Sequence, residues 1–250
     1  MAGRRGAVLS IESTSVQDYV KAIYALTEWQ EDAVTATHLA TRLSVANSSV
    51  TGMVAKLVDL GLAEHRKYGP VSLTPAGLAL ALAMVRRHRL IETFLVTELG
   101  YGWDEVHDEA ELLEHTVSDV FVERLDAKLG RPRRDPHGDP IPRADGSVRY
   151  PRAHRLDGLD DGHAGRLVRV SDDDPDVLRF LDLNGIMLDD VLVAQHRAGS
   201  VLELRLGGDT GPGLAVDVVF ARSLWIESAG PHEGCTLAGP GESRLRDSRS

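Results

Sequence analysis

The sequence has one cysteine, few aromatic residues and no long hydrophobic run. The single thiol, Cys235, excludes an intramolecular disulfide framework and any cysteine-rich zinc or iron–sulfur site. Aromatic residues make up 5% of the chain, so leucine, valine and alanine must fill most of the core. No apolar run is long enough to cross a bilayer, and Ala7-Val8-Leu9 is too short for the core of a signal peptide. We therefore expect a cytoplasmic protein without a membrane partner.

Positive charge is also in short supply. The formal net charge of -10 argues against broad, nonspecific binding to nucleic acid. The acidic excess is not uniform, however, because basic and acidic residues balance through Pro75. At about 150 residues per domain, the 250 residues predict one or two domains, and 42% apolar residues are enough for a packed core. The first segment can still bind DNA if its basic residues share a face.

The first segment has the order of a winged helix-turn-helix. Apolar residues recur with helical spacing from Val16, and two shorter helices are predicted over 35–43 and 47–60. The stretches 62–66 and 71–73 read as two strands joined by a tight turn. A different small α+β unit is the alternative, but the polar front of the third helix favours DNA binding. The predicted DNA-binding residues are Asn47, Ser48, Ser49, Thr51, Lys56, Arg66 and Lys67.

The rest of the chain divides by composition. The predicted fold is mainly α, with an α+β winged helix, a helical segment, and a small β-barrel at the C-terminal end. Short strands separated by glycine-rich turns predict the barrel. The predicted ranges are a disordered lead over 1–13, the winged helix over 14–74, the helical domain over 75–142, a linker over 143–163, the barrel over 164–227 and a disordered tail over 228–250.

Metal-ligating residue types recur on predicted helix faces. His107, Glu111, Glu114 and His115 stand at i, i+4, i+7 and i+8, and therefore share one face of a helix. A solvated charged face is the simpler interpretation. A second helix with His88 and Glu92 as an i, i+4 pair, joined to the first by a short loop, favours metal binding instead. Asp18 on the first helix is a further candidate.

The donor types limit the metal. Seven nitrogen and oxygen donors exceed the usual shell of one ion, so we expect about two ions per subunit. Carboxylate and imidazole donors without a thiolate favour Mn(II) or Fe(II) over softer ions. A dinuclear metallohydrolase is the alternative of another class, because such sites also activate water. The sequence shows no pattern for a substrate pocket or a lid, so we expect no enzyme and no small organic substrate. A permanent structural clip is a further alternative.

Eight short motifs occur in a fixed order along the chain. They are Asp18-Tyr19-Val20, Ser48-Ser49-Val50-Thr51, Thr74-Pro75-Ala76-Gly77, Arg87-His88-Arg89-Leu90-Ile91-Glu92, Val106-His107-Asp108-Glu109-Ala110, Glu114-His115, Ser118-Asp119 and Gly138-Asp139-Pro140-Ile141-Pro142. With these motifs the chain resembles the diphtheria toxin repressor family of metal-dependent repressors over about residues 14–227. The resemblance implies a homodimer in which Mn(II) or Fe(II) enables binding to double-stranded operator DNA and represses metal-uptake genes. It also implies that the helical domain binds metal and dimerises, and that the C-terminal barrel is SH3-like.

Two positions relate the chain to a branch of that family. The iron-responsive branch typically has Met and Cys where this chain has Asp18 and Glu111, whereas the manganese transport regulators have Asp and Glu. The resemblance therefore implies a Mn(II)-activated repressor, with an Fe(II)-activated one as the alternative. It implies a primary site of Asp18, Glu111, Glu114 and His115, and an ancillary site of His88, Glu92 and His107.

The chain also departs from the family pattern. Some manganese regulators have a Glu where this chain has Lys21, which puts their two-ion geometry in doubt here. The ligands that the barrel supplies in the iron branch have no clear counterpart. Asp172, Asp173 and Asp174 are the candidates, and the sequence leaves the choice among them open.

Overall fold

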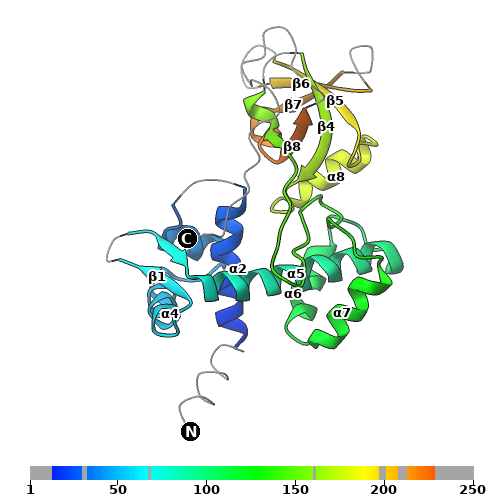
Figure 1. Cartoon of the computed structure of the whole chain (residues 1–250). Coiled ribbons are helices and arrows are strands. Elements are labelled where there is room, and N and C mark those ends of the chain that lie inside the picture. Colours follow the sequence, from blue (N-terminus) through cyan, green and yellow to red (C-terminus); the bar gives the residue numbers. More distant parts are fainter. Residues whose placement is uncertain are drawn as a thin grey trace. The chain divides into compact units, whose positions relative to one another are not determined.

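The computed structural model describes residues 13–29, 33–66, 69–159, 162–196, 201–207 and 213–228 (Figure 1). Most of the predicted lead and tail, and the predicted DNA-binding residue Lys67, lie outside these ranges. The chain forms two compact units. The first unit contains Met1–His88, Leu113–Val122 and Pro142–Ser147, and the second contains Arg89–Leu112, Glu123–Ile141 and Val148–Ser250.

The first unit contains the predicted winged helix-turn-helix. Its elements are α2 (Thr14–Glu28), α3 (Ala36–Arg42), α4 (Asn47–Asp59), β1 (Ala63–His65) and β2 (Val71–Leu73). Thr35 caps α3 by accepting a hydrogen bond from the His38 backbone. Ser44, with φ 53°, makes the tight turn into α4. Strands β1 and β2 pair antiparallel as the wing.

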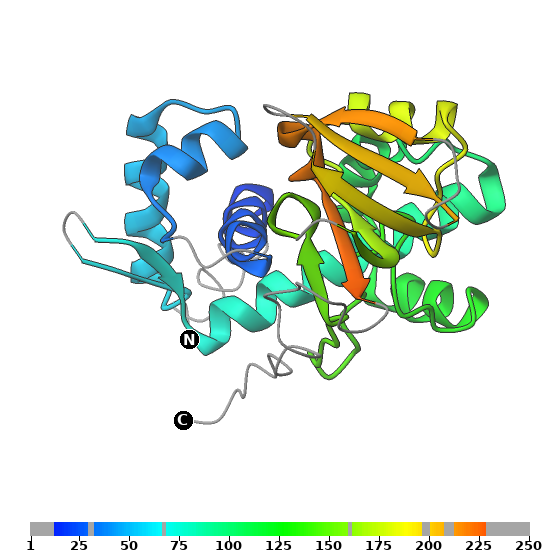
Figure 2. The same ribbon diagram turned by 90° about the horizontal axis from the view of Figure 1, so that it is seen from above.

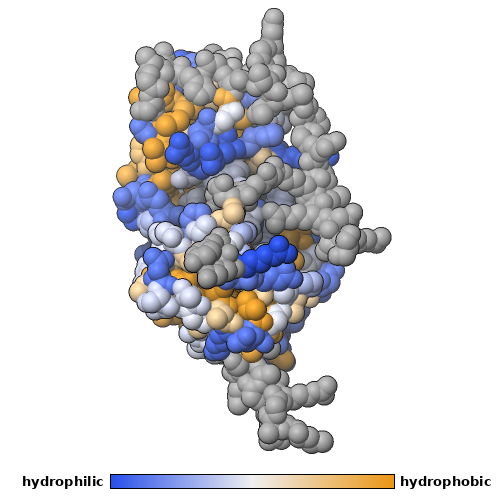
Figure 3. Space-filling view, turned by 90° about the vertical axis from the view of Figure 1, so that its left-hand side faces the viewer, coloured by the Kyte–Doolittle hydropathy of each residue, from blue (hydrophilic) through white to orange (hydrophobic). Residues whose placement is uncertain are grey.

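The apolar faces predicted from the sequence form the core of this winged helix. Val20 and Ile23 of α2 are buried, as are Leu39 of α3 and Val50 and Leu57 of α4. The polar residues at the start of α4 are exposed, while the apolar side of this helix packs inward. On the molecular face drawn in Figure 3, hydrophilic and hydrophobic residues alternate in patches.

Three helices follow the wing: α5 (Pro75–Leu99), α6 (Val106–Glu114) and α7 (Asp119–Lys128). Thr74 caps α5 by accepting a hydrogen bond from the Gly77 backbone, and Pro75 occupies the first turn, where it leaves no donor unpaired. A Cβ at Gly77 would lie 1.9 Å from the Leu62 carbonyl oxygen, so only glycine allows this approach of α5 to the wing. Gly130, with φ 76°, follows α7.

The second unit contains an antiparallel sheet with the strand order β3-β8-β4-β5-β6-β7. Helix α8 packs beside the sheet (Figure 2), and its Leu178 and Leu181 join the apolar core that the strands enclose. This arrangement confirms the predicted SH3-like domain. The elements are β3 (Ala153–Arg155), the short 3-10 helix η1 (Leu156–Gly158), β4 (His163–Val170), α8 (Pro175–Leu183), β5 (Val191–His196), β6 (Val201–Leu206), β7 (Gly213–Asp217), α9 (Val218–Ala221) and β8 (Leu224–Ser228).

Strand β3 falls within residues 143–163, for which the sequence predicts a linker. It pairs antiparallel with β8 over only three residues, from Ala153↔Glu227 to Arg155↔Trp225. Three residues are too few for an alternating pattern to stand out. Strand β3 therefore depends on tertiary pairing with β8 and could not be predicted from its local sequence.

The turn at residues 135–141 packs directly on the sheet. Asp135 Oδ1 accepts hydrogen bonds from the backbone N–H groups of His137 and Asp139. The Val170 backbone then donates to the His137 carbonyl oxygen. Gly138, with φ 92°, lies so close to β4 that a Cβ would stand 2.0 Å from the Val168 oxygen. The end of β4 is thus held against the helical part of the same unit.

Candidate metal centre

The first cluster joins α2 to the end of α6. His115 Nε2 lies 2.9 Å from Asp18 Oδ1 and 3.5 Å from Glu114 Oε1. One ligand atom from each of these three residues lies within 4.8 Å of the others. Glu111 stands one turn earlier on the continuous helix α6. We term Asp18, Glu111, Glu114 and His115 the first cluster.

The ring of His115 is oriented as a ligand should be. Its Nδ1 donates a hydrogen bond to Gln17 Oε1 at 2.9 Å. The other ring nitrogen, Nε2, lies 2.9 Å from Asp18 Oδ1, so one ion could bind both atoms. Metal-binding histidines usually have this kind of supporting hydrogen bond. Gln17 could not be predicted from the sequence, because a glutamine beside a metal ligand forms no recognisable sequence pattern.

Lys21 lies against this cluster. Its Nζ is 2.9 Å from Glu114 Oε1 and 2.7 Å from Oε2. The same nitrogen is 3.1 Å from His88 Nδ1, which is itself 2.7 Å from Glu114 Oε2. The Glu114 side chain is 0% exposed, so these partners take the place of water around its carboxylate oxygens.

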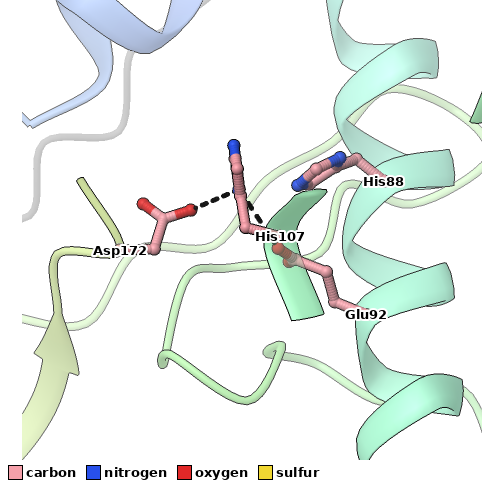
Figure 4. A group of neighbouring side chains, drawn as sticks. All are labelled: His88, Glu92, His107 and Asp172. Carbon is pink, nitrogen blue, oxygen red and sulfur yellow. Dashed lines mark ion pairs between the residues drawn. The ribbon is translucent and has the colours of Figure 1, made fainter. Parts of the chain in front are cut away.

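The second cluster gathers around His107. Its Nδ1 lies 2.9 Å from Asp172 Oδ2 and 3.5 Å from Glu92 Oε1. His88 precedes Glu92 by one turn on α5, and Figure 4 draws the four side chains together. We term His88, Glu92, His107 and Asp172 the second cluster.

The structure distinguishes the three aspartates that the sequence left open. Asp172 follows β4 and points toward His107. Asp173 instead accepts a hydrogen bond from the Ser171 hydroxyl. Asp174 caps α8 by accepting from the Asp176 backbone. Of the three, Asp172 is the one that lies in a group of potential ligands.

Protons and metal ions compete for His107. Burial alone would lower the pKa of His107, but hydrogen bonds to Asp172 and Glu92 outweigh it and raise this pKa to about 10. The ring is therefore protonated at neutral pH in the metal-free protein. Because the folded pKa is raised, this charge stabilises the metal-free fold below the unfolded pKa of about 6.5, and that contribution is lost as the pH rises through about 10.

An ion entering the second cluster must displace this proton, so we expect its affinity for Mn(II) to rise about tenfold per pH unit between pH 7 and 9. Calorimetric titrations in buffers of different ionisation enthalpy should show release of about one proton per ion from this cluster. His107→Gln should abolish that proton release. Release that persists in this variant would show that another group titrates.

A third group of potential ligands, not predicted from the sequence, shares Glu92 with the second cluster. Glu92, Asp135 and His137 are all buried and each offers a ligand atom within 4.8 Å of the others. His137 Nε2 lies 2.6 Å from the Trp103 carbonyl oxygen, and its Nδ1 faces Glu92 Oε2 at 4.0 Å. Burial, followed by the charges of Asp139 and Glu92, raises the pKa of Asp135 to about 8. No pattern in the sequence indicated this group, because a turn lacks the periodicity that reveals a shared face.

The predicted DNA-binding side chains lie on the winged helix. Asn47, Ser48, Ser49 and Thr51 are exposed on the first turns of α4. Lys56 is half-buried further along the helix, and Arg66 is exposed where β1 ends. Lys67 lies outside the described residues, so its position relative to the others is not described.

The donor sets fit a divalent ion. Both clusters present only imidazole nitrogen and carboxylate oxygen, and buried carboxylates supply negative charge close to the histidines. Comparison with known families then identifies the chain. The DNA-binding domain of iron-dependent repressors matches residues 13–71, and their metal-binding and dimerisation domain matches residues 74–143. The chain belongs to the iron-dependent repressor family.

The names of proteins similar to this repressor refer to different metals. The iron-dependent repressor IdeR of Mycobacterium tuberculosis is 33% identical over 206 residues, which cover 81% of this chain and 86% of IdeR. A solved manganese-dependent transcriptional repressor in complex with manganese is 47% identical, with a TM-score of 0.81 over 85% of this chain and 99% of that chain. The manganese regulator SloR is 36% identical, with a TM-score of 0.71 over 85% of this chain and 98% of that one.

These matches confirm the resemblance found in the sequence. The repressor is a metal-dependent DNA-binding transcriptional regulator with a dimerisation domain. The family consists of repressors rather than enzymes, so the alternative of a dinuclear hydrolase is excluded. No helix in the described ranges of the repressor has both the length and the apolar composition needed to cross a membrane.

Proposed function

We propose that the chain is a Mn(II)-activated repressor of metal-ion uptake genes, in which metal binding orders a dimer for operator DNA. The observation that carries this proposal is the first cluster, where Asp18 supplies a carboxylate from α2 and His115 faces it at 2.9 Å. Oxygen and imidazole donors without sulfur suit Mn(II). The 47% identity to a manganese-dependent repressor supports the same metal.

Two ions per subunit are part of the proposal. Asp18, Glu111, Glu114 and His115 would hold one ion, and His88, Glu92, His107 and Asp172 would hold the other. A bound ion would supply positive charge that fastens α2 to α6, because the ligands of the first cluster come from both helices. Since α2 packs within the winged helix, this link connects metal occupancy to the position of the DNA-binding elements.

The DNA contacts are proposed from exposure and chemistry. Polar groups at the start of α4 are suited to base edges and phosphates, while Lys56 and Arg66 are suited to phosphates. We retain Lys67 in this set on its sequence position. Val120 and Phe121 of α7, 63% and 46% exposed, offer apolar surface to a second copy of the chain. We also retain the domain ranges 14–74, 75–142 and 164–227, and a cytoplasmic location.

Operator binding at defined free metal concentrations tests the proposal. We expect Mn(II) to raise the affinity for operator DNA about a hundredfold over that of chelator-treated protein. This factor is near the upper end of the coupling usually found between two binding sites. Equal binding in the presence of chelator would refute metal activation. Lys128→Met, an exposed change on α7, serves as a control that should respond to Mn(II) as the wild type does.

Activation by Fe(II) is the second candidate, and the identity to IdeR supports it. The double variant Asp18→Met with Glu111→Cys separates the two. If the carboxylates select Mn(II), the variant should lose its response to Mn(II) and keep or gain one to Fe(II), because thiolate and thioether donors suit softer ions. A wild type that responds to Fe(II) at lower free concentration than Mn(II) would favour the second candidate.

A further inference from the structure

Lys21 contacts both carboxylate oxygens of Glu114, whereas an ion pair needs only one. Its Nζ contacts both carboxylate oxygens, at 2.9 and 2.7 Å. Each carboxylate oxygen offers about two lone-pair directions. Oε2 meets Lys21 and His88 Nδ1, both at 2.7 Å, while Oε1 meets Lys21 and faces His115 Nε2 at 3.5 Å. An ion shared by Glu114 and His115 would therefore bind the same Oε1 oxygen that Lys21 contacts.

Charge gives the same result as geometry. A divalent ion at Glu114 would lie within a few ångströms of the Lys21 ammonium, at a carboxylate that is 0% exposed. Like charges at that separation repel strongly where water does not screen them. The ammonium and the ion are thus alternative partners of one carboxylate.

The Lys21 side chain can also move away from Glu114. Its side chain is 14% exposed, so it reaches Glu114 from the edge of the cluster rather than from a closed interior. A lysine stem is flexible along its length and can carry its ammonium to solvent without a change in the backbone. No comparable freedom exists for His88, whose side chain is 6% exposed on α5.

We propose that the Lys21 ammonium is a built-in competitor for metal at the first cluster, which holds Glu114 in the metal-free protein and is displaced when a divalent ion binds. This inference rests on the proposed metal activation and adds a regulatory residue to it. Lys21 sets the free metal concentration at which the first cluster fills. In the metal-free state it also keeps α2 attached to α5 and α6 through contacts with His88 and Glu114.

Substitution of Lys21 in the full chain tests the competition. Mn(II) binding is measured by electron paramagnetic resonance of the free ion and by calorimetry. We expect Lys21→Gln and Lys21→Met to bind Mn(II) at the first cluster tenfold or more tightly than the wild type. Lys21→Arg should stay near the wild type because it keeps the charge. Lys128→Met removes one exposed positive charge elsewhere and should leave the affinity unchanged.

Unchanged or weaker Mn(II) binding by folded Lys21→Gln and Lys21→Met would overturn the proposal, because a shared structural ion pair gives that result. If neither variant folds, the wild type decides through the rate at which an amine-acetylating reagent labels Lys21, followed by mass spectrometry. Added Mn(II) should raise that rate several-fold, and an unchanged rate overturns the proposal. A wild type that binds no Mn(II) at all would instead refute the proposed function.

Discussion

Glu114→Gln should lower the affinity of the first cluster for Mn(II) by about a hundredfold or more and abolish metal-dependent operator binding. The change keeps the shape of the side chain and removes the one fully buried carboxylate of the cluster, which lies 3.5 Å from His115. Even partners that only support a metal ligand change affinity by about 10–100-fold, so loss of the ligand charge should reach at least the upper end.

The matched control is Glu109→Gln, the same chemical change on the same helix α6 and outside both clusters. It should bind Mn(II) and operator DNA like the wild type. Circular dichroism checks that both variants are folded, because Glu114→Gln also removes the charge opposite Lys21. Folded Glu114→Gln protein with wild-type Mn(II) affinity would contradict its assignment as a ligand.

Arg169→Met should cost about 3 kcal/mol in unfolding free energy, because it removes the nearest cationic partner of the buried Asp139 carboxylate, which keeps the longer 3.5 Å ion pair to Arg89. Arg169 Nε lies 2.7 Å from Asp139 Oδ1, and the two side chains are 8% and 6% exposed. The guanidinium also stacks on Trp225, 4.0 Å from the ring centroid. Urea unfolding followed by tryptophan fluorescence measures the loss.

The same strand provides the control for this prediction. Arg166 pairs with Glu227 and Asp189 at the surface, where ion pairs contribute about 0–1 kcal/mol. Arg166→Met should therefore change the unfolding free energy little. Equal losses in the two variants would mean that burial of the Arg169 pair is not what stabilises this region.

Loss of Arg169 should also weaken Mn(II) binding by the second cluster. Arg169 ties β4 to the turn that contains Asp139, and Asp172 leaves the end of the same strand toward His107. Weaker anchoring of β4 releases Asp172 from its position. The affinity of the second cluster for Mn(II) should thus fall in Arg169→Met and stay unchanged in Arg166→Met.

Helical periodicity made much of this structure predictable. Spacing alone predicted that Glu111, Glu114 and His115 lie close together, and they do so at the end of α6 and in the turn after it. The recurring apolar residues likewise located the helices of the winged helix. The sheet was predictable because its longer strands alternate and are separated by glycine. Patterns of this kind work where one element supplies several members of a set.

Single contributions from separate segments were not predictable in the same way. Asp172 was one of three consecutive aspartates, and only the packing of β4 selects it. His137 and Asp135 come from a turn, where no periodic face exists to show that they meet Glu92. Lys21 has no metal-ligating chemistry, so its contact with Glu114 depends on how α2 packs against the end of α6. These residues meet through tertiary structure, which local sequence does not encode by itself.

The two oxygens of Glu92 face different histidines. Oε1 lies toward His107 and Oε2 toward His137, and the side chain is 1% exposed. One negative charge therefore serves two rings that belong to different groups of potential ligands. The two histidines are electrostatically coupled through this carboxylate. A proton or a metal ion that neutralises Glu92 beside one histidine therefore changes the affinity of the other for protons and metal ions. Measurements on His107 and His137 should accordingly be interpreted as properties of a pair.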